Sequence, residues 1–396
     1  MKKINNVLLF RMVYFLIYFA DALFTPFYGL YLLSLNFSAE EVSIVLGVIP
    51  FAACLGSLLL GRISSTFKGN LLLMKILILF EIAGVLLLAY LSSFGVLVGV
   101  VILLAFANGV YYQIEDGASS LALKKEGKSF SSVRIFGSLG FLAALGACYG
   151  LLEVWIYPYL FSLAAGIFFL AFILLHFFTP YPEEAEPLPS RETEKAKWGD
   201  LLLNRSFMVF LCFYFLLNGV VSVEGYCLPL YLHDLGLSDQ NYSLLNAFRV
   251  GVEVVAVAFY KPIKRLLKSD RNCLLVGAGI LLFSSFGIIL FQDPWAIAFT
   301  NYACRGVGGA LLFIGFVDYL SQVLPSSALT RGLALCSALM DIMTGTFNFV
   351  SAPIYLATSY WTFFAILSGV ATLGFVFLFF AKDERKLRRD GPKEKE

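Results

Sequence analysis

Histidine and paired cysteine are nearly absent from this 396-residue chain. It has two histidines, far apart at His176 and His233, and none of its seven cysteines forms a CxxC pair. A zinc site or a disulfide framework is therefore not expected, and we interpret the cysteines as small packing residues. The chain also lacks a nucleophile–base pair and a metal motif, which argues against an intramembrane enzyme and against a bound cofactor or metal.

Charged residues are scarce as well. They make up 14% of the chain, while 59% of the residues are hydrophobic and the mean hydropathy is +0.82. Soluble domains contain about 45–50% apolar and about 25% charged residues. The composition therefore predicts an integral membrane protein, and the net charge of +2 adds little to this conclusion.

The N-terminus, MKKINNVLLFRMVYFLIYF, has the charged start of a signal peptide. Its apolar run continues through Leu33 without a small-residue cleavage site, which predicts a retained first helix.

Long apolar runs predict an all-α membrane protein with twelve transmembrane helices, because one span needs about 20 mostly apolar residues. The expected helices cover 8–33, 41–60, 71–91, 95–117, 132–152, 156–178, 207–232, 242–262, 273–292, 296–320, 330–353 and 358–381. We expect a six-helix bundle over 1–179, a polar cytoplasmic linker over 180–206, a second six-helix bundle over 207–381 and a cytoplasmic tail over 382–396.

Lysine and arginine support this layout. Of the 29, all but Arg249 and Arg305 lie at the N-terminus, in alternate loops, in the linker, in the tail or at adjoining helix ends. The opposite loops contain none (34–40, 92–94, 153–155, 233–241, 293–295 and 354–357). This positive-inside pattern predicts that both termini are cytoplasmic, and we expect a bacterial cytoplasmic membrane.

The two halves resemble each other. GLYLLSLNFSAEEVS (29–43) and PLYLHDLGLSDQNYS (229–243) match at six of fifteen positions with an offset of 200. The same offset places ISSTFK (63–68) on IKRLLK (263–268). Parallel six-helix repeats are a known transporter architecture, with the solute site near the membrane midplane.

Twelve spans in two halves, with a long central loop, resemble the major facilitator superfamily over the whole chain. GRISSTFKGN (61–70) is similar to the loop signature of that superfamily in Gly61 and its basic residues. It lacks the signature aspartate, since Ser65 stands about where one is expected.

VRIFGSLGF (133–141) resembles the start of the fifth helix in the oligosaccharide/proton symporters, the lactose permease group. That resemblance implies a sugar-contacting pair of Asp116 and Arg134, with Glu115 beside Asp116, and a sugar-binding Glu253 ahead of Pro262. The tenth helix departs from the group: Arg305 stands in place of a histidine and Gly308 in place of the proton-carrying glutamate. Asp341 stands near the position of a lysine.

The remaining charges inside the spans favour a polar pathway, since such groups usually face the bundle interior. Arg249 and Glu253 lie four residues apart and are expected to pair on one helical face. Arg305 is able to neutralise one more acid, for which we name Asp341. At least two of the acids Asp21, Glu81, Glu224, Glu253 and Asp341 then have no cation, and an unpaired carboxyl in a low-dielectric site takes up a proton.

Other readings of these residues stay open. Arg249 and Glu253 are alternatively a self-neutralising pair that eases insertion. Asp116 and Arg134 lie near cytoplasmic helix ends and serve equally well as a gate latch. Asp21 and Glu224 lie close to Pro26 and Pro229, which are able to open helix backbone toward a cavity. Asp318 and His176 are expected to be solvated.

Small residues and tyrosines also have expected roles, in helix packing and in substrate binding. Gly146 with Gly150, and the glycines at 306, 308 and 309, suit close helix packing. Five tyrosines are placed to stack on a ring or sugar face: Tyr28, Tyr31, Tyr111, Tyr112 and Tyr231. ATP binding is not supported, because GKS at 127–129 lacks the first P-loop glycine, whose position is Ala122.

These features predict a monomeric secondary transporter that takes up a small polar solute, a saccharide or nucleoside-like molecule, together with a proton. The substrate-binding candidates are Asp116, Arg134, Glu253, Arg249, Arg305, Tyr28 and Tyr112, and the proton-coupling candidates are Asp21, Glu224 and Asp341. One rival is a proton antiporter that exports a drug or metabolite, although the fifth helix lacks the proline of drug antiporters. A rival of another class is a membrane sensor or lipid scramblase. No nucleic-acid partner is expected.

Overall fold

A computed structural model describes residues 5–60, 66–126, 130–179, 201–324 and 326–381, and the regular structure within these ranges is helical. Eleven of the described helices are long and apolar enough to cross a membrane, and a bent helix pair makes a possible twelfth. The expectation of an all-α membrane protein is confirmed. The predicted tail, most of the linker, the GKS segment and half of the 61–70 loop lie outside the described residues.

The chain divides into two compact units. The first comprises Met1–Arg191 together with Leu237–Ala247 and Asn348–Ala352, and the second comprises Glu192–Gly236, Phe248–Phe347 and Pro353–Glu396. The short segment 237–247 is tied to the rest of its unit by side chains. Ser243 Oγ donates a hydrogen bond to the carbonyl of Leu145 at 2.6 Å, and the Tyr242 hydroxyl donates to the carbonyl of Pro26 at 3.1 Å.

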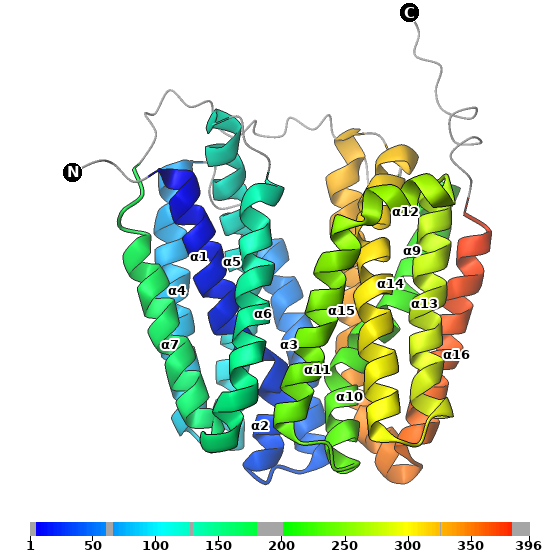
Figure 1. The fold of residues 1–396 in the computed structure, drawn as a ribbon, viewed down its shortest axis with the longest axis horizontal. Coiled ribbons are helices and arrows are strands. Elements are labelled where there is room, and N and C mark those ends of the chain that lie inside the picture. Colours follow the sequence, from blue (N-terminus) through cyan, green and yellow to red (C-terminus); the bar gives the residue numbers. More distant parts are fainter. Residues whose placement is uncertain (1–4, 61–65, 127–129, 180–200, 325, 382–396) are drawn as a thin grey trace, which may run out of the picture. The chain divides into compact units, whose positions relative to one another are not determined.

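The first unit is built around α1, which packs against α6 and α7, while α4 packs against α5 and α7 (Figure 1). Its elements are α1 (Asn6–Ala22), a 3₁₀ turn η1 (Thr25–Phe27), α2 (Tyr28–Ser34), α3 (Ala39–Leu60), α4 (Phe67–Tyr90), α5 (Phe94–Glu126), α6 (Ser131–Val154) and α7 (Tyr157–Leu174).

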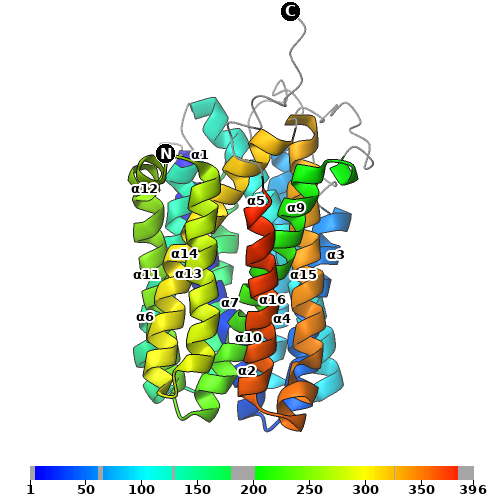
Figure 2. The ribbon, with the colours of Figure 1, turned by 90° about the vertical axis from the view of Figure 1, so that its right-hand side faces the viewer.

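In the second unit, α13 packs against α14 and α16, and α16 also packs against α9 (Figure 2). The elements are α9 (Arg205–Phe213), a π-helical turn η2 (Tyr214–Asn218), α10 (Gly219–Asp234), α11 (Asp239–Ala258), α12 (Tyr260–Leu267), α13 (Asp270–Leu290), α14 (Pro294–Val323), α15 (Ser326–Ala357) and α16 (Tyr360–Phe379). The first residues of α11 and a short part of α15 belong to the first unit.

Proline breaks one of the two expected helices and leaves the other continuous. Before Pro26, α1 ends at Ala22 and the chain turns through η1. Pro26 lacks the N–H that would donate to the carbonyl of Ala22 and continue the helix. The carbonyl of Asp21 accepts from the hydroxyl of Thr25 at 2.8 Å and from the backbone N–H of Phe24 at 3.2 Å. By contrast, α10 runs through Pro229 without a break. The expected opening of the backbone is therefore found only next to Asp21.

The predicted eighth helix, 242–262, is wrong as a single straight element. The structure has α11 ending at Ala258 and α12 beginning at Tyr260, with a bend of 61° between them. Pro262 explains the break, because it cannot donate to the carbonyl four residues earlier, which is that of Ala258. The predicted fourth helix was too short, since α5 continues to Glu126.

The internal repeat is visible in the backbone. Asn36 and Gly236, 200 residues apart, both adopt the left-handed conformation, with φ of 62° and 88°. Two residues later, the hydroxyls of Ser38 and Ser238 each accept a hydrogen bond from the backbone N–H three residues on, at 3.2 and 3.3 Å. The sequence match between 29–43 and 229–243 thus corresponds to the same turn at the start of the following helix.

Two glycines in the VRIFGSLGF segment allow α6 to approach α1 closely. A Cβ added at Gly140 lies 2.2 Å from the carbonyl oxygen of Phe15, and one added at Gly137 lies 3.0 Å from the ring of Tyr18. The expected packing role of Gly146 and Gly150 is wrong, because an added Cβ at either position meets nothing within 4 Å. Among the glycines of α14, Gly306 and Gly308 make close contacts and Gly309 does not.

Gly140→Ala is expected to lower the free energy of unfolding by about 1–3 kcal/mol, because the new methyl group collides with backbone that cannot move aside easily. Gly146→Ala is the matched control on the same helix. It should leave stability unchanged or raise it by up to about 1 kcal/mol, since alanine is the better helix former. Thermal unfolding of both purified variants in detergent checks this, and equal midpoints would contradict the assigned contact.

Candidate functional site

A half-buried polar site in the first unit is organised by Tyr14. This side chain is fully buried, and its hydroxyl donates to Asp116 Oδ1 at 2.6 Å and lies 3.0 Å from the hydroxyl of Ser119. The contact joins α1 to α5 and fixes one oxygen of Asp116. A carboxylate has acceptor capacity beyond one hydrogen bond, so Asp116 remains able to accept from a ligand.

Arg134 is connected to this group through Tyr18, whose ring stacks on that of Tyr14 with centroids 6.0 Å apart. Its guanidinium carbon is 4.7 Å from the centroid of the Tyr18 ring, and the Tyr18 and Tyr112 rings are 5.0 Å apart. Both tyrosines are half-buried and Arg134 is exposed. The site therefore combines two accessible aromatic rings, one carboxylate and one guanidinium from α1, α5 and α6.

Tyr28, the other tyrosine named from the sequence, lies in a different setting. It is 7% exposed, and its ring packs edge-on against Phe24 with centroids 5.7 Å apart. This tyrosine contributes to the packing of the first unit.

Three carboxyl groups are buried deeper in the same unit. Asp21 of α1 and Glu81 of α4 are each 3% exposed, and Glu115 of α5 is fully buried. Both oxygens of Asp21, both of Glu81 and Oε2 of Glu115 lack hydrogen-bond partners within the part of the chain that the structure describes. The remaining oxygen, Glu115 Oε1, accepts from the hydroxyl of Tyr111 at 3.4 Å.

In the second unit, the predicted pair of Arg249 and Glu253 is confirmed. Arg249 Nη1 lies 3.4 Å from Glu253 Oε2, with the two side chains 25% and 43% exposed. Gly306 of α14 lies against this turn of α11, because an added Cβ there is 2.8 Å from the carbonyl oxygen of Arg249. The pair is thus accessible and held close to α14.

The second arginine of this unit lies with Glu224. Glu224 of α10 is 1% exposed and interacts electrostatically with Arg305 of α14. The guanidinium of Arg305 lies over the backbone of α10, since a Cβ added at Gly225 is 2.9 Å from Arg305 Nη2. The acid that the structure gives to Arg305 is therefore Glu224, whereas the sequence suggested Asp341. Asp341 itself is half-buried and interacts with Tyr226.

Tyr14 and Tyr18 were not among the residues predicted from the sequence, although their spacing indicates a shared helical face. Positions 14, 18 and 21 follow the i, i+4, i+7 pattern of one helical face, which places Asp21 in line with the two tyrosines.

Asp318 was expected to be solvated. It is 39% exposed but also pairs with Lys264 at 2.9 Å, and the same lysine lies 2.5 Å from Asp270.

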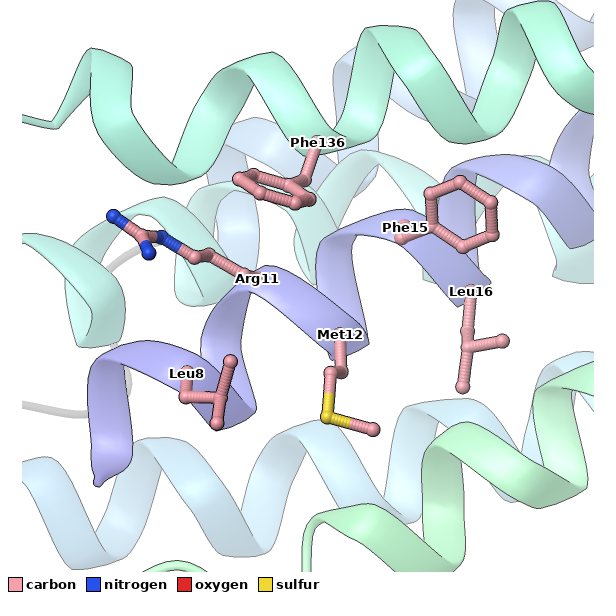
Figure 3. A pocket seen from close by; sticks show the side chains of 6 residues that line it. All are labelled: Leu8, Arg11, Met12, Phe15, Leu16 and Phe136. Carbon is pink, nitrogen blue, oxygen red and sulfur yellow. The ribbon is translucent and has the colours of Figure 1, made fainter. Parts of the chain in front are cut away.

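A groove on the opposite face of α1 has a different character. It is lined by Leu8, Arg11, Met12, Phe15 and Leu16 of α1 and by Phe136 of α6 (Figure 3). The only polar group in this lining, Arg11, donates from Nε to the carbonyl of Ser132 at 3.1 Å. Such an apolar lining does not suit a polar solute, so the groove is not part of the site formed by Tyr14 and Asp116. Within the described residues, no group of three or more metal-ligating side chains is found.

Comparison with known proteins agrees with this architecture. The chain is 25% identical to a maltose permease of Geobacillus stearothermophilus over 389 residues, covering 95% of each protein. It is 27% identical to sugar efflux transporter A of Escherichia coli strain K12 over 230 residues, or 56% of this chain and 54% of that protein.

Solved structures show the same fold. A crystal structure of a variant of the nucleoside transporter NupG superposes with a TM-score of 0.80 at 16% identity, covering 96% of this chain and 100% of that one. The xylose transporter XylE of E. coli, in an inward-open conformation, gives a TM-score of 0.71 at 13% identity, with coverage of 97% and 98%.

The family assignment comes from the sequence over most of its length. The model of the MFS_1-like family matches residues 7–352. The apolar spans, the two units and the structural neighbours agree with that match. This integral membrane protein therefore belongs to the MFS_1-like family of transporters and is not an enzyme.

Proposed function

We propose that this protein is a secondary active transporter that takes up a saccharide together with a proton by alternating access. The observation that carries the proposal is the group formed by Tyr18, Tyr112, Asp116 and Arg134 in the first unit. A sugar presents hydroxyls and an apolar ring face to its binding site. Carboxylate and guanidinium groups bind the hydroxyls, and an aromatic ring covers the apolar face.

The comparisons support a sugar as the first substrate to test. One relative along nearly the whole chain is a maltose permease, and the structural neighbours include xylose and nucleoside transporters. We therefore rank saccharides before nucleosides, which have the same combination of hydroxyls and a flat ring.

The second unit supplies further candidate contacts. Glu253 and Arg249 are partly exposed, and Arg305 lies over Gly225 beside Glu224. These polar groups are proposed as substrate contacts because charged side chains within membrane spans commonly mark substrate pathways. We propose hydrogen bonding to substrate for Glu253, Arg249 and Arg305. Tyr28 is a weaker candidate because its ring is buried.

Proton coupling is proposed for Asp21, Glu224 and Asp341, whose surroundings differ. Glu224 has Arg305 beside it, which stabilises its ionised form. Asp341 is half-buried. Asp21 is fully inside the first unit, and its described interactions include no basic neighbour.

We further propose that the protein is a monomer in a bacterial cytoplasmic membrane, with both termini on the cytoplasmic side. We also propose that lipid acyl chains cover the groove of Figure 3.

Export of a sugar is the alternative that a specific observation favours, because one relative is named a sugar efflux transporter. The same binding site serves either direction, and the imposed gradients decide between them.

Sugar-induced proton movement tests the proposal directly. Maltose, other saccharides and nucleosides are added to de-energised vesicles in weak buffer while the external pH is recorded. We expect alkalinisation with a saccharide in vesicles that contain the protein and none in vesicles that lack it. Equilibration of a labelled sugar without a pH change would exclude proton coupling. Proton-driven loss of sugar from preloaded vesicles would favour export.

The ring of Tyr18 is expected to be the aromatic element of the site. Tyr18→Leu should raise the KM for sugar about three- to tenfold, because the contact between ring and guanidinium that orients Arg134 is lost. Tyr18→Phe keeps the ring and should stay within about twofold of the wild type, on the same reasoning. Initial uptake rates over a range of sugar concentrations measure this, and equal KM values for the two variants would contradict the role of the ring.

Gly225→Ala is expected to displace Arg305 without unfolding the protein. The new Cβ lies 2.9 Å from the end of a flexible side chain, which moves at little cost. Transport should fall because the guanidinium then leaves its position beside Glu224, from which it is proposed to bind substrate, while the thermal midpoint stays near that of the wild type. Gly309→Ala on α14, where an added Cβ meets nothing within 4 Å, is the control. Normal transport by Gly225→Ala would make the arginine a structural counter-charge only.

A further inference from the structure

The three acids Asp21, Glu81 and Glu115 come from three different helices and converge inside the first unit. Glu81 interacts electrostatically with Asp21, and Glu115 interacts with Asp21 and with Asp116. All three are at least nine-tenths buried. Two of them are 60 and 94 residues from Asp21 in sequence, so the grouping is a product of the fold and not of local spacing.

Among the described interactions of these acids, none is with a basic side chain. The described interactions of the three carboxyl groups are with one another, with Asp116, with Tyr111 and, for Asp21, with Asn108. The lysine of α4 nearest to Glu81 in sequence is Lys75, six residues or about 9 Å along the helix axis. Arg134 of α6 is exposed beside Tyr18.

An uncompensated group of this kind is too costly to stay ionised. Moving a carboxylate out of water without a partner costs several kcal/mol even after relaxation of the surroundings, and like charges nearby add to this cost. Five of the six carboxyl oxygens have no donor in hydrogen-bond geometry among the described residues, although the side chain of Asn108 interacts with Asp21. Buried carboxylates commonly have such donors. A bound proton removes the charge of one carboxyl group and gives that group an O–H donor toward a second carboxylate.

We propose that Asp21, Glu81 and Glu115 together form a proton-binding site within the first unit, and that this site holds the transported proton. The inference rests on the proposed proton-coupled function and identifies the site of coupling. The proton forms an O–H bond to one carboxyl oxygen and hydrogen-bonds to a second carboxylate. On release to water the same O–H bond breaks, and no other bond changes.

The connection to the proposed sugar site runs through α5. Glu115 and Asp116 are adjacent in sequence, and each has a tyrosine hydroxyl as a donor: Tyr111 for Glu115 and Tyr14 for Asp116. A sugar hydroxyl that donates to Asp116 changes the field at Glu115, with which Asp116 interacts. Binding of sugar and binding of the proton therefore act on neighbouring carboxyl groups, which is the requirement for coupling two sites.

The end of α1 next to Asp21 bears on how this acid is able to move. Because α1 ends at Ala22, the backbone next to Asp21 is not part of a continuous helix. Local rearrangement of η1 therefore moves Asp21 relative to Glu81 and Glu115 without bending a continuous helix. Such a movement alters how well the three carboxyl groups share a proton.

The test separates accumulation from exchange. Glu81→Gln, Glu115→Gln and Asp21→Asn each replace a carboxyl group by an uncharged amide of similar shape that binds no proton, so the variants are expected to fold with nearly unchanged thermal midpoints. Each should lose accumulation of sugar driven by an imposed pH gradient. Exchange of labelled for unlabelled sugar at equal concentrations needs no net proton movement and should persist. Glu153→Gln, an exposed acid on α6, is the control and should accumulate sugar normally.

A second measurement does not depend on the identity of the substrate. Infrared spectra of the purified protein in nanodiscs should show a protonated-carboxyl band at neutral pH that weakens in Glu81→Gln and in Asp21→Asn. Accumulation by all three variants, or spectra in which this band is unchanged in both, would overturn the proton site. Absence of sugar transport in the wild type, with the band still lost in the variants, would overturn the proposed substrate and leave the proton site standing.

Discussion

The hydrocarbon core offers neither water nor counter-ions, and this constraint governs the polar groups of the structure. A charge within the membrane spans of such a chain, whether fully or partly buried, is stabilised by a partner of opposite charge or removed by a proton. The second unit meets the requirement with arginines: Arg249 pairs with Glu253, and Arg305 lies beside Glu224. The first unit has no such arrangement for Asp21, Glu81 and Glu115 among its described residues. The two units therefore solve the same physical problem differently.

The positions of these polar groups also depend on close contacts between helices, which glycine residues make possible. Gly137 and Gly140 let α6 approach α1, and this approach brings Arg134 over the ring of Tyr18. Gly306 likewise allows α14 to approach α11 closely at Arg249. The glycines close to the polar groups thus determine where those groups lie, whereas Gly146 and Gly150 face open space.

Much of the fold followed from composition and periodicity, because long apolar runs have few alternatives in a membrane. The spans, the repeat and the pair of Arg249 and Glu253 depend on contacts within a helix or on local sequence. The bend before Pro262 was missed because apolar character continues across it. The partner of Arg305 and the meeting of Asp21 with Glu81 and Glu115 could not be predicted, since they depend on how helices distant in sequence turn their faces toward one another.

The repeated turn at Asn36 and Gly236 aligns the first helices of the two halves, and this alignment bears on the history of the molecule. With the offset of 200 residues, Asp21 corresponds to Val221 and Glu224 corresponds to Phe24. Neither acid has a counterpart in the other half, although both halves retain the same turn. If the halves arose by duplication of one ancestral gene, the turn is inherited from that ancestor and the acids were gained or lost separately afterwards. Descent from a symmetric ancestor then explains the scaffold, and later divergence of each copy explains its charges.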